Sequence, residues 1–221
     1  MNTAMILAAG RGERLRPLTD TTPKALCVVH GMPLIERHVI NLARAGISRI
    51  IINHAYLGSK IRQYLGDGSR YGVNLLYSPE PPGALETGGG IVNALPFIGK
   101  NPFITVNADI FTDFDFSTLS LPINSLAHYI LIKKPSYYLQ GDFGLSTDGF
   151  LTNDLRDFTF SGIACYDPIL FKGLKPYRFS VIPLIRQQIN SKHISGNLFD
   201  GTWTDIGTID RLKEFQAAKK N

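Results

Sequence analysis

Strand-like and helix-like patterns alternate along the first half of the chain. Apolar runs at 5–9, 49–53, 73–77 and 102–107 have the length and composition of buried strands. Apolar residues recur at helical spacing over 34–43 and 57–65, each stretch ends before a glycine, and a third helix is expected to begin near 88. Because this alternation is typical of parallel sheets covered by helices on both faces, we predict an α/β, doubly wound, Rossmann-like, mixed but mostly parallel sheet.

The second half is less regular and predicts a smaller antiparallel or mixed section. Residues 127–133, 158–166 and 193–199 have strand patterns, with a helix near 181–190. Thr208 is placed to cap a last helix with Ile209, Leu212 and Phe215 on its apolar side. No repeat or interdomain linker interrupts the 221 residues, so we expect one domain over 1–221.

Composition excludes several classes of protein. The net charge is +5, but the cations are dispersed and no aromatic-basic repeat occurs, so a nucleic-acid partner is not expected. There is no apolar run of roughly 18 residues and no signal leader, which predicts a cytoplasmic protein without a membrane partner. Cys27 and Cys165 lack disulfide or metal spacing, and the five histidines show no zinc spacing, so these side chains are predicted to be mostly structural.

The first apolar run breaks into a basic, glycine-rich segment, GRGERLRPLT at 10–19, and Pro23-Lys24 follows. Gly10 and Gly12 let main-chain N–H groups approach a ligand, and nearby arginines and Lys24 add positive charge that suits a polyphosphate. Leu15 stands where a dinucleotide motif needs its third glycine, and no P-loop is present. A plain strand-to-helix connection with solvated arginines is the alternative interpretation.

Read as a whole, 7–19 with Pro23-Lys24 resembles the signature of the sugar nucleotidyltransferase family, L-A-A-G-x-G-x-R-L-x-P-L-T followed by P-K. Segments 52–58, 65–69, 77–80, 85–90 and 203–208 are similar to those of its short bacterial N-acetylmuramate 1-phosphate uridylyltransferases. The resemblance implies Mg²⁺-dependent transfer of UMP from UTP to this sugar 1-phosphate, with release of pyrophosphate, in peptidoglycan recycling. It also implies no C-terminal β-helix domain. Alternatives are another hexose 1-phosphate, such as glucose or mannose 1-phosphate with dTTP, UTP or GTP, and a non-catalytic nucleotide-sugar sensor.

In such a reaction the attacking phosphate is already an anion, so cations and a metal matter more than a general base. The resemblance assigns Arg14 to the departing phosphates and Lys24 to the α-phosphate and the sugar phosphate. It assigns Mg²⁺ to Asp109 and Asp205, although Asp113 and Asp115 lie nearby in sequence. Two carboxylates completed by phosphate and water oxygens suit octahedral Mg²⁺.

The expected binding residues follow predicted strands, so the segments 10–24, 78–90 and 107–113 should meet at one edge of the sheet. His54 is a further candidate for substrate contact, and a monomer or small homo-oligomer is expected. Two departures from close relatives bear on the sugar: Ala108 replaces a frequent glycine, and Ser180 replaces a frequent lysine. The resemblance implies that the smaller section of the second half binds the sugar. The nucleotide is expected at Ala8, Ala9, Gly10, Gly12, Arg14, Lys24, Asn53, Glu80, Glu86, Thr87 and Gly88, and the sugar at Asn107, Gly141, Asp142, Ser161 and Gly162.

Overall fold

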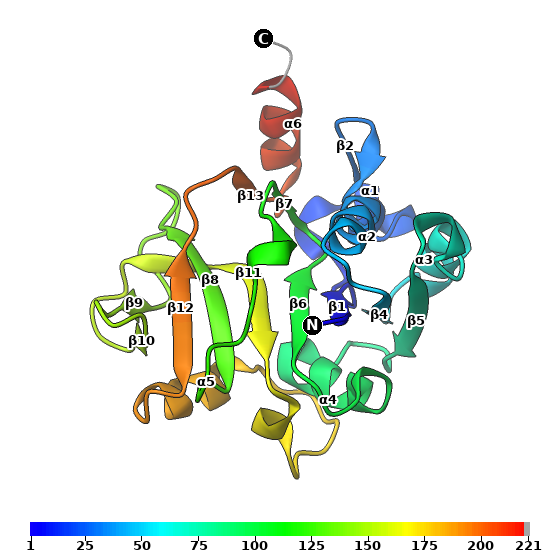
Figure 1. The fold of residues 1–221 in the computed structure, drawn as a ribbon. Helices are drawn as coiled ribbons and strands as arrows, with labels where there is room; N and C mark the ends of the chain where they lie inside the picture. Colours follow the sequence, from blue (N-terminus) through cyan, green and yellow to red (C-terminus); the bar gives the residue numbers. More distant parts are fainter. Residues whose placement is uncertain (219–221) are drawn as a thin grey trace.

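A seven-stranded sheet forms the centre of the computed structural model, which describes residues 1–218 (Figure 1). Strand β11 alone runs against the other six, so the predicted mixed, mostly parallel sheet is confirmed. The strands of the second half extend this same sheet, and a small antiparallel pair, β9 with β10, lies apart from it. In spatial order the sheet contains β12 (Ile194–Leu198), β8 (Ala127–Lys133), β11 (Phe158–Tyr166), β6 (Phe103–Asn107), β1 (Thr3–Leu7), β4 (Arg49–His54) and β5 (Asn74–Pro79); β9 is Gly144–Leu145 and β10 is Leu151–Thr152.

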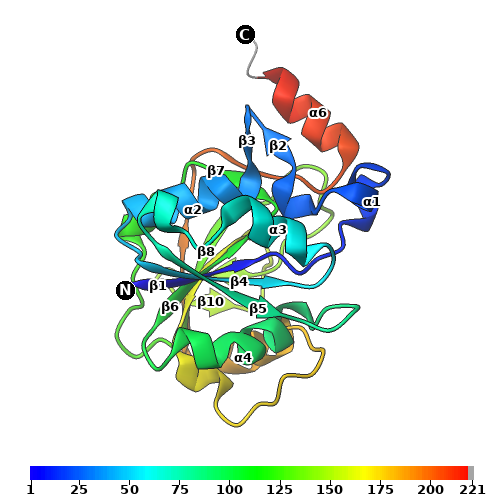
Figure 2. The same cartoon turned by 90° about the vertical axis from the view of Figure 1, so that its right-hand side faces the viewer.

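Helices cover both faces of the sheet (Figure 2). One face carries α2 (Leu34–Arg44) and α3 (Gly58–Leu65), and the other carries α4 (Glu86–Ile98) and α5 (Ile182–Ile189). The alternation of side chains along the strands explains the two layers, because Ala4 and Ile6 of β1 enter the first core and Met5 enters the second. No helix of residues 1–218 has both the length and the apolar character needed to cross a membrane.

Short elements at the upper edge of Figure 1 complete the fold. Strand β7 (Ile110–Thr112) pairs with β13 (Trp203–Asp205), which sequence patterns did not indicate because each strand has only three residues. The last helix is confirmed as α6 (Ile209–Ala218), and Thr208 Oγ1 accepts the N–H of Arg211 at 3.3 Å. The remaining elements are α1 (Leu18–Thr21), the hairpin β2 (Val28–Val29) and β3 (Met32–Pro33), and the short 3-10 helices η1 (Glu13–Leu15), η2 (Lys24–Leu26), η3 (Ser69–Tyr71), η4 (Phe116–Thr118) and η5 (Pro168–Phe171).

Candidate active site

Two adjoining cavities open at the carboxyl ends of the strands. The first, of about 400 Å³, is lined by the loops that follow β1, β5 and β6. The predicted convergence of 10–24, 78–90 and 107–113 is therefore confirmed. The second, of about 300 Å³, lies over β11 and β13. Asn107 and Asp109 line both cavities, so a ligand in one lies next to a ligand in the other.

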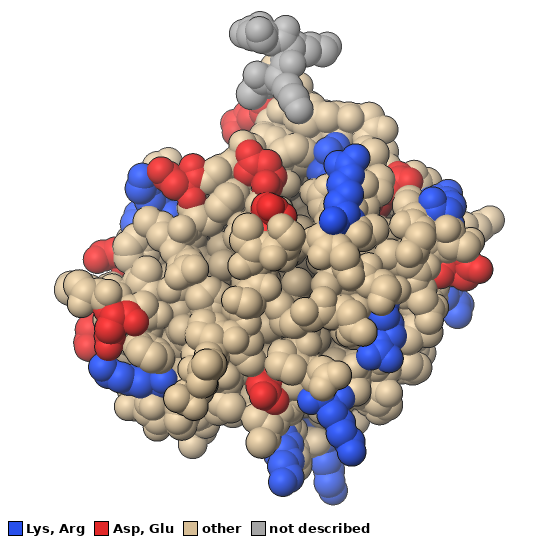
Figure 3. Space-filling model, in the orientation of Figure 1, with Lys and Arg blue, Asp and Glu red and all other residues tan. Residues whose placement is uncertain are grey.

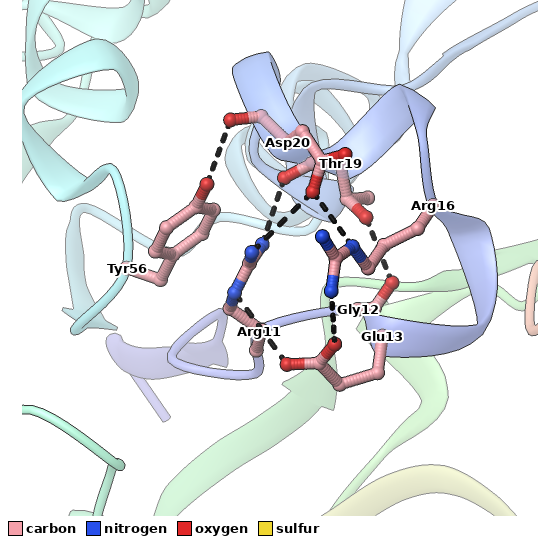
Figure 4. Close-up of polar contacts among 7 residues, drawn as sticks. All are labelled: Arg11, Gly12, Glu13, Arg16, Thr19, Asp20 and Tyr56. Carbon is pink, nitrogen blue, oxygen red and sulfur yellow. Dashed lines mark hydrogen bonds and ion pairs between the residues drawn. The ribbon is translucent and has the colours of Figure 1, made fainter.

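Arginines of the glycine-rich loop hold the loop together (Figure 4). The Arg11 guanidinium donates to the main-chain oxygen of Thr19 at 3.0 Å and stacks on the ring of Tyr56, 3.7 Å from its centroid. Arg16 pairs with Asp20 at 2.8 Å. These contacts give both arginines a structural role, although Arg11 also lines the first cavity.

Gly12 has a conformation that few other residues adopt. Its φ is +72°, and a Cβ there would lie 3.1 Å from atoms of Lys24 and Thr19. Gly12 therefore allows Lys24 to pass close to the loop and reach the first cavity, which Ala8, Ala9 and Gly10 also line.

A chain of hydrogen bonds joins the loop after β1 to the loop after β5. Asn53 accepts the N–H of Ala8 at 2.8 Å and donates to Glu80 Oε1 at 2.6 Å. The second carboxylate oxygen of Glu80 accepts the N–H of Leu85 at 2.7 Å. Asn53 lines the first cavity, whereas Glu80 does not and lines a separate cavity with Arg11 and Tyr56. The structure thus places Asn53 and Glu80 as supports of the two loops.

The glycines at 88–90 are packed against other parts of the protein. A Cβ on Gly88 would lie 2.3 Å from the ring of Phe179, and one on Gly90 would lie 2.6 Å from Glu80 Oε1. The N–H groups of Gly88 and Gly89 donate to the Phe179 main-chain oxygen. The space left by these glycines is thus filled by the loop that carries Phe179 and by the side chain of Glu80.

That loop contributes one residue to the first cavity that sequence reasoning did not identify. Arg178 lines the cavity together with Glu86 and Thr87, and its Nε lies 3.2 Å from Glu86 Oε1. Both side chains of this ion pair are well exposed. No motif marks Arg178, because 92 residues separate it from Glu86 in the sequence.

Two carboxylates and two cations lie where the cavities meet. Lys24 Nζ is 2.5 Å from Asp109 Oδ2. Asp205 lines the second cavity, and its Oδ2 is 2.5 Å from Nη1 of Arg211. The pairing of β7 with β13 sets Asp205 opposite Ile110, and this brings it next to Asp109 despite the distance in sequence.

Asp205 also accepts a hydrogen bond from the Tyr137 hydroxyl, at 2.9 Å. Burial and this hydrogen bond raise the pKa of Tyr137, so its hydroxyl stays protonated and donates. Sequence reasoning found neither residue, because Tyr137 is 68 residues away from Asp205 in the sequence, and Arg211, six residues after Asp205, lies beyond the 203–208 segment.

Arg14 belongs to the same cluster, although its side chain is exposed. A Cβ on Gly207 would lie 2.8 Å from Asp205 Oδ2, 3.1 Å from Arg211 Nη1 and 3.3 Å from Arg14 Nη2. Burial raises the pKa of Tyr138, and the guanidinium groups of Arg211 and Arg14 oppose this shift. Arg14 therefore lies near Asp205.

The second cavity is shaped by an irregularity in β11. The register with β8 shifts between Phe160 and Ile163, and Gly162 there has φ +85°. Ser161 Oγ donates to a main-chain oxygen of β8, and the main-chain oxygen of Ser161 accepts a hydrogen bond from Nε1 of Trp203 at 2.7 Å. Asp142 accepts the N–H of Phe160 at 2.9 Å. The bulge thus presents Ser161 and Gly162 to the cavity.

Of the expected sugar residues, Asn107, Asp142, Ser161 and Gly162 line this cavity. Gly141 instead packs on the β11 main chain, where a Cβ would lie 2.5 Å from the Phe158 oxygen. None of the described residues that line this cavity is Lys or Arg. Ser180 accepts the N–H of Ile182 at 3.3 Å and so helps to begin α5.

Other candidate groups are buried away from the cavities. His54 is buried beside Gly58 and lines neither cavity, and burial, together with the Arg62 charge, lowers its pKa. Both cysteines are free and buried, which confirms them as packing residues, and burial raises the pKa of the Cys165 thiol to about 12. Within residues 1–218 there is no cluster of three or more His, Cys, Asp or Glu side chains suited to a metal ion.

Lys and Arg side chains are scattered over the face that Figure 3 shows, and Asp and Glu side chains lie among them. The dispersed cations expected from the sequence are therefore visible on this face, where no continuous basic surface forms.

Comparison with known proteins agrees with this geometry. Residues 3–138 match the nucleotidyl transferase family. The chain belongs to this family. It is 48% identical to an N-acetylmuramate alpha-1-phosphate uridylyltransferase of Neisseria meningitidis serogroup B, over 97% of this chain and 96% of that protein. A protein of the same name from Caulobacter vibrioides is 27% identical over 92% of this chain and 91% of its own length.

A solved structure shows how the nucleotidyl transferase fold is shared. UDP-glucose pyrophosphorylase complexed with UDP-glucose superposes with a TM-score of 0.81, at 19% identity and with all of both chains covered. At this identity the likeness supports the fold, and the activity is argued from the sequence relatives and the site.

Proposed function

We propose that this nucleotidyl transferase moves UMP from UTP to N-acetylmuramate 1-phosphate, giving UDP-N-acetylmuramate and pyrophosphate in peptidoglycan recycling. The observation that carries the proposal is the 48% identity to the Neisseria meningitidis protein over nearly all of both chains. The geometry agrees with it, because two cavities that share Asn107 and Asp109 suit two substrates that react with each other. Glucose or mannose 1-phosphate is not favoured by this match.

The first cavity is proposed to hold UTP and the second the sugar 1-phosphate. A sugar phosphate oxygen attacks the α-phosphorus, a new P–O bond forms, and the bond to the bridging oxygen breaks as pyrophosphate leaves. Lys24 reaches the first cavity beside Asp109, where it can neutralise the approaching phosphate charges. Arg14 is proposed to bind the departing phosphates.

Asp109 and Asp205 fit a magnesium ion by their chemistry and position. Both are carboxylates that line the second cavity, and Asp109 also faces the first. Two carboxylates are a common protein share of a Mg²⁺ shell that substrate phosphates and waters complete. Bound there, the ion would supply charge neutralisation at the α-phosphate and the leaving group.

The second cavity offers hydrogen-bonding groups for the sugar instead of a fixed cation. Asp142, Ser161, Gln140 and Tyr138 line it, together with Gly162, whose main chain is open to the cavity. We propose that the Gln140 amide, the Tyr138 hydroxyl and main-chain donors of this set receive the lactyl carboxylate, because Ser180 supplies no positive charge. A cytoplasmic location and a monomer or small homo-oligomer remain part of the proposal.

A substrate matrix that follows pyrophosphate release tests the activity. UTP, dTTP and GTP are each combined with N-acetylmuramate, glucose and mannose 1-phosphates in Mg²⁺ buffer. The highest kcat/KM is expected for UTP with N-acetylmuramate 1-phosphate. Turnover confined to a neutral hexose 1-phosphate would overturn the sugar assignment, and nucleotide binding without turnover of any pair would favour the sensor.

Asp109→Asn and Asp205→Asn test the metal assignment. Each should lower kcat by about 10²-fold or more, because a carboxylate ligand of the ion is lost, while folding stays near wild type. Asp115→Asn is the matched control, since Asp115 only accepts the N–H of Ser117 and an amide oxygen can do the same. Near-normal turnover of both test variants would remove the metal role.

A further inference from the structure

Both proposed metal-binding carboxylates are paired with a cationic side chain of the protein itself. Asp109 is paired with Lys24, and Asp205 is paired with Arg211 through Nη1 at 2.5 Å. The second pair is largely shielded from solvent, since the side chains of Arg211 and Asp205 are 21% and 14% exposed. Each carboxylate charge is thus balanced before any ligand arrives.

Arg211 is held in place by contacts besides the ion pair. Its guanidinium carbon lies 3.9 Å from the centroid of the Tyr137 ring, a cation–π arrangement. The main-chain N–H of Arg211 is bonded to Thr208 at the start of α6. If the charge of Asp205 were taken up by another cation, the stacked guanidinium would keep its place beside Asp205, which lines the second cavity, and the donor that pairs with Asp205 would be released.

Arg14 lies near the same group. Atoms of Arg14, Arg211 and Asp205 all lie within 3.3 Å of the position a Cβ of Gly207 would occupy. Two guanidinium groups thus lie near a single carboxylate, which is ion-paired with Arg211, and this group carries an excess of positive charge. Forked donors of this kind match the oxygens of a phosphate or pyrophosphate group.

We propose that Arg211, on the C-terminal helix α6, is a phosphate-binding residue that acts with Arg14 on the departing pyrophosphate. Its guanidinium neutralises Asp205, and a divalent cation held by Asp205 would leave that guanidinium available to the phosphates. This inference rests on the proposed function, because it takes Asp205 as a metal-binding carboxylate.

A purely structural role for the ion pair is the competing explanation, namely that it fastens α6 to the protein. The helix is already attached by Leu212, which is buried against Leu15 and Phe111, and by the ring of Phe215, 4.7 Å from that of Phe111. This apolar contact does not involve Arg211, so the guanidinium is not needed to anchor the helix.

Arg211→Gln tests the proposal by ligand binding, measured calorimetrically without turnover. Lys213→Gln is the matched control, because Lys213 is exposed on the same helix and the variant loses the same charge. Pyrophosphate in Mg²⁺ buffer should bind Arg211→Gln about tenfold or more weakly than the wild type, and Arg211→Lys should lie between them. Lys213→Gln should bind like the wild type.

Mn²⁺ without nucleotide gives the second readout. Removal of the competing guanidinium should let Arg211→Gln bind Mn²⁺ about threefold to tenfold more tightly than the wild type, by direct titration. Unchanged Mn²⁺ and pyrophosphate affinities would overturn the proposal. A fall in thermal stability with unchanged pyrophosphate affinity would also overturn it, since that is the result of a structural anchor.

These outcomes are separate from failure of the proposed function. The titrations use neither the sugar nor the base, so a wrong substrate leaves them unaffected. Unchanged Mn²⁺ affinity in Asp205→Asn would overturn the metal role and with it the exchange at Asp205. Weaker pyrophosphate binding by Arg211→Gln in metal-free buffer would still support Arg211 as a phosphate-binding residue.

Discussion

The variant Asn53→Asp, in which an oxygen replaces the side-chain amide nitrogen, tests whether the hydrogen bond between Asn53 and Glu80 sets the geometry of the nucleotide loops. Asn53 is 2% exposed, and its oxygen accepts the N–H of Ala8 while its amide donates to Glu80 at 2.6 Å. Asn53→Asp keeps the shape and the bond to Ala8 but sets a second carboxylate oxygen against Glu80.

The structure sets the size of the effect. Two unit charges 2.6 Å apart repel by about 6 kcal/mol at an effective dielectric constant of about 20. Protonation of one carboxyl relieves this repulsion at a lower cost. A carboxyl whose ordinary pKa is about 4 takes up a proton at pH 7 at a cost of about 4 kcal/mol. Since Glu80 is partly exposed and solvent screens the pair, we expect Asn53→Asp to lower the free energy of unfolding by about 2–4 kcal/mol at pH 7.

The loss should depend on pH in a defined direction. The folded variant binds one more proton than its unfolded chain, because the paired carboxyls share a proton with a raised pKa. Its stability relative to the wild type therefore falls as pH rises above about 4, by at most about 1.4 kcal/mol per pH unit, and recovers as pH falls toward 4. Urea unfolding at pH 5, 6, 7 and 8 measures this difference.

A double variant provides the decisive control. When Asn53→Asp is combined with Glu80→Gln, the amide introduced at position 80 can donate to the new carboxylate at position 53, while its oxygen accepts the N–H of Leu85. The donor and acceptor pattern is restored, so the pH-dependent loss should disappear. Equal stability of Asn53→Asp and wild type at pH 7, or a double variant no more stable than the single variants, would refute the argument.

Two further predictions concern the second cavity and the acid stability of the fold. Gly162→Ala should lower turnover and lower the free energy of unfolding by about 1–3 kcal/mol, because alanine is strained at φ +85° and its Cβ would lie 2.8 Å from the Asn107 amide. Gly149→Ala is the control, since Gly149 has φ +83° and no atom within 4 Å of an added Cβ. In thermal unfolding it should show the backbone strain alone, and its turnover should be unchanged. His38 donates from Nε2 to the main-chain oxygen of Ile110, and burial lowers its pKa to about 4. Because this histidine takes up its proton at a higher pH in the unfolded chain than in the folded protein, the free energy of unfolding falls as pH drops from about 6.5 to 4. His38→Gln keeps a donor without that titration, and denaturant curves should show a smaller acid loss, by up to about 3 kcal/mol; an identical acid profile would contradict the assignment.

Sequence periodicity predicted the sheet and the edge where the site forms, because both follow from local patterns. The parallel strands β1, β4, β5 and β6 are apolar runs with clear ends, and the carboxyl ends of parallel strands lie on one edge. The pairing of β7 with β13 was not predictable in this way. Its three-residue strands carry too little periodicity, and the two strands lie far apart in the sequence.

Two side chains of the site were not predicted from the sequence. Arg178 lines the first cavity next to Glu86, 92 residues away in the sequence, and Arg211 pairs with Asp205 six residues before it but belongs to no motif. The glycines at 88–90 leave space, but the sequence did not show that Phe179 and Glu80 fill it. A small residue indicates that space is needed, whereas only the packed structure shows which group fills that space.

The sheet topology explains why the two cavities meet at Asp109. Strand β6 is the strand at which the sheet changes direction, with β1 parallel on one side and β11 antiparallel on the other. Its carboxyl end therefore borders the glycine-rich loop after β1 and also the bulge of β11. Asn107 is the last residue of β6, and Asp109 lies in the loop that follows it. In-line phosphoryl transfer requires the two substrates to meet end to end. A carboxylate at the carboxyl end of β6 can reach both substrates from one side chain. This position favours Asp109 over the neighbouring Asp113 and Asp115 as the proposed centre of the reaction.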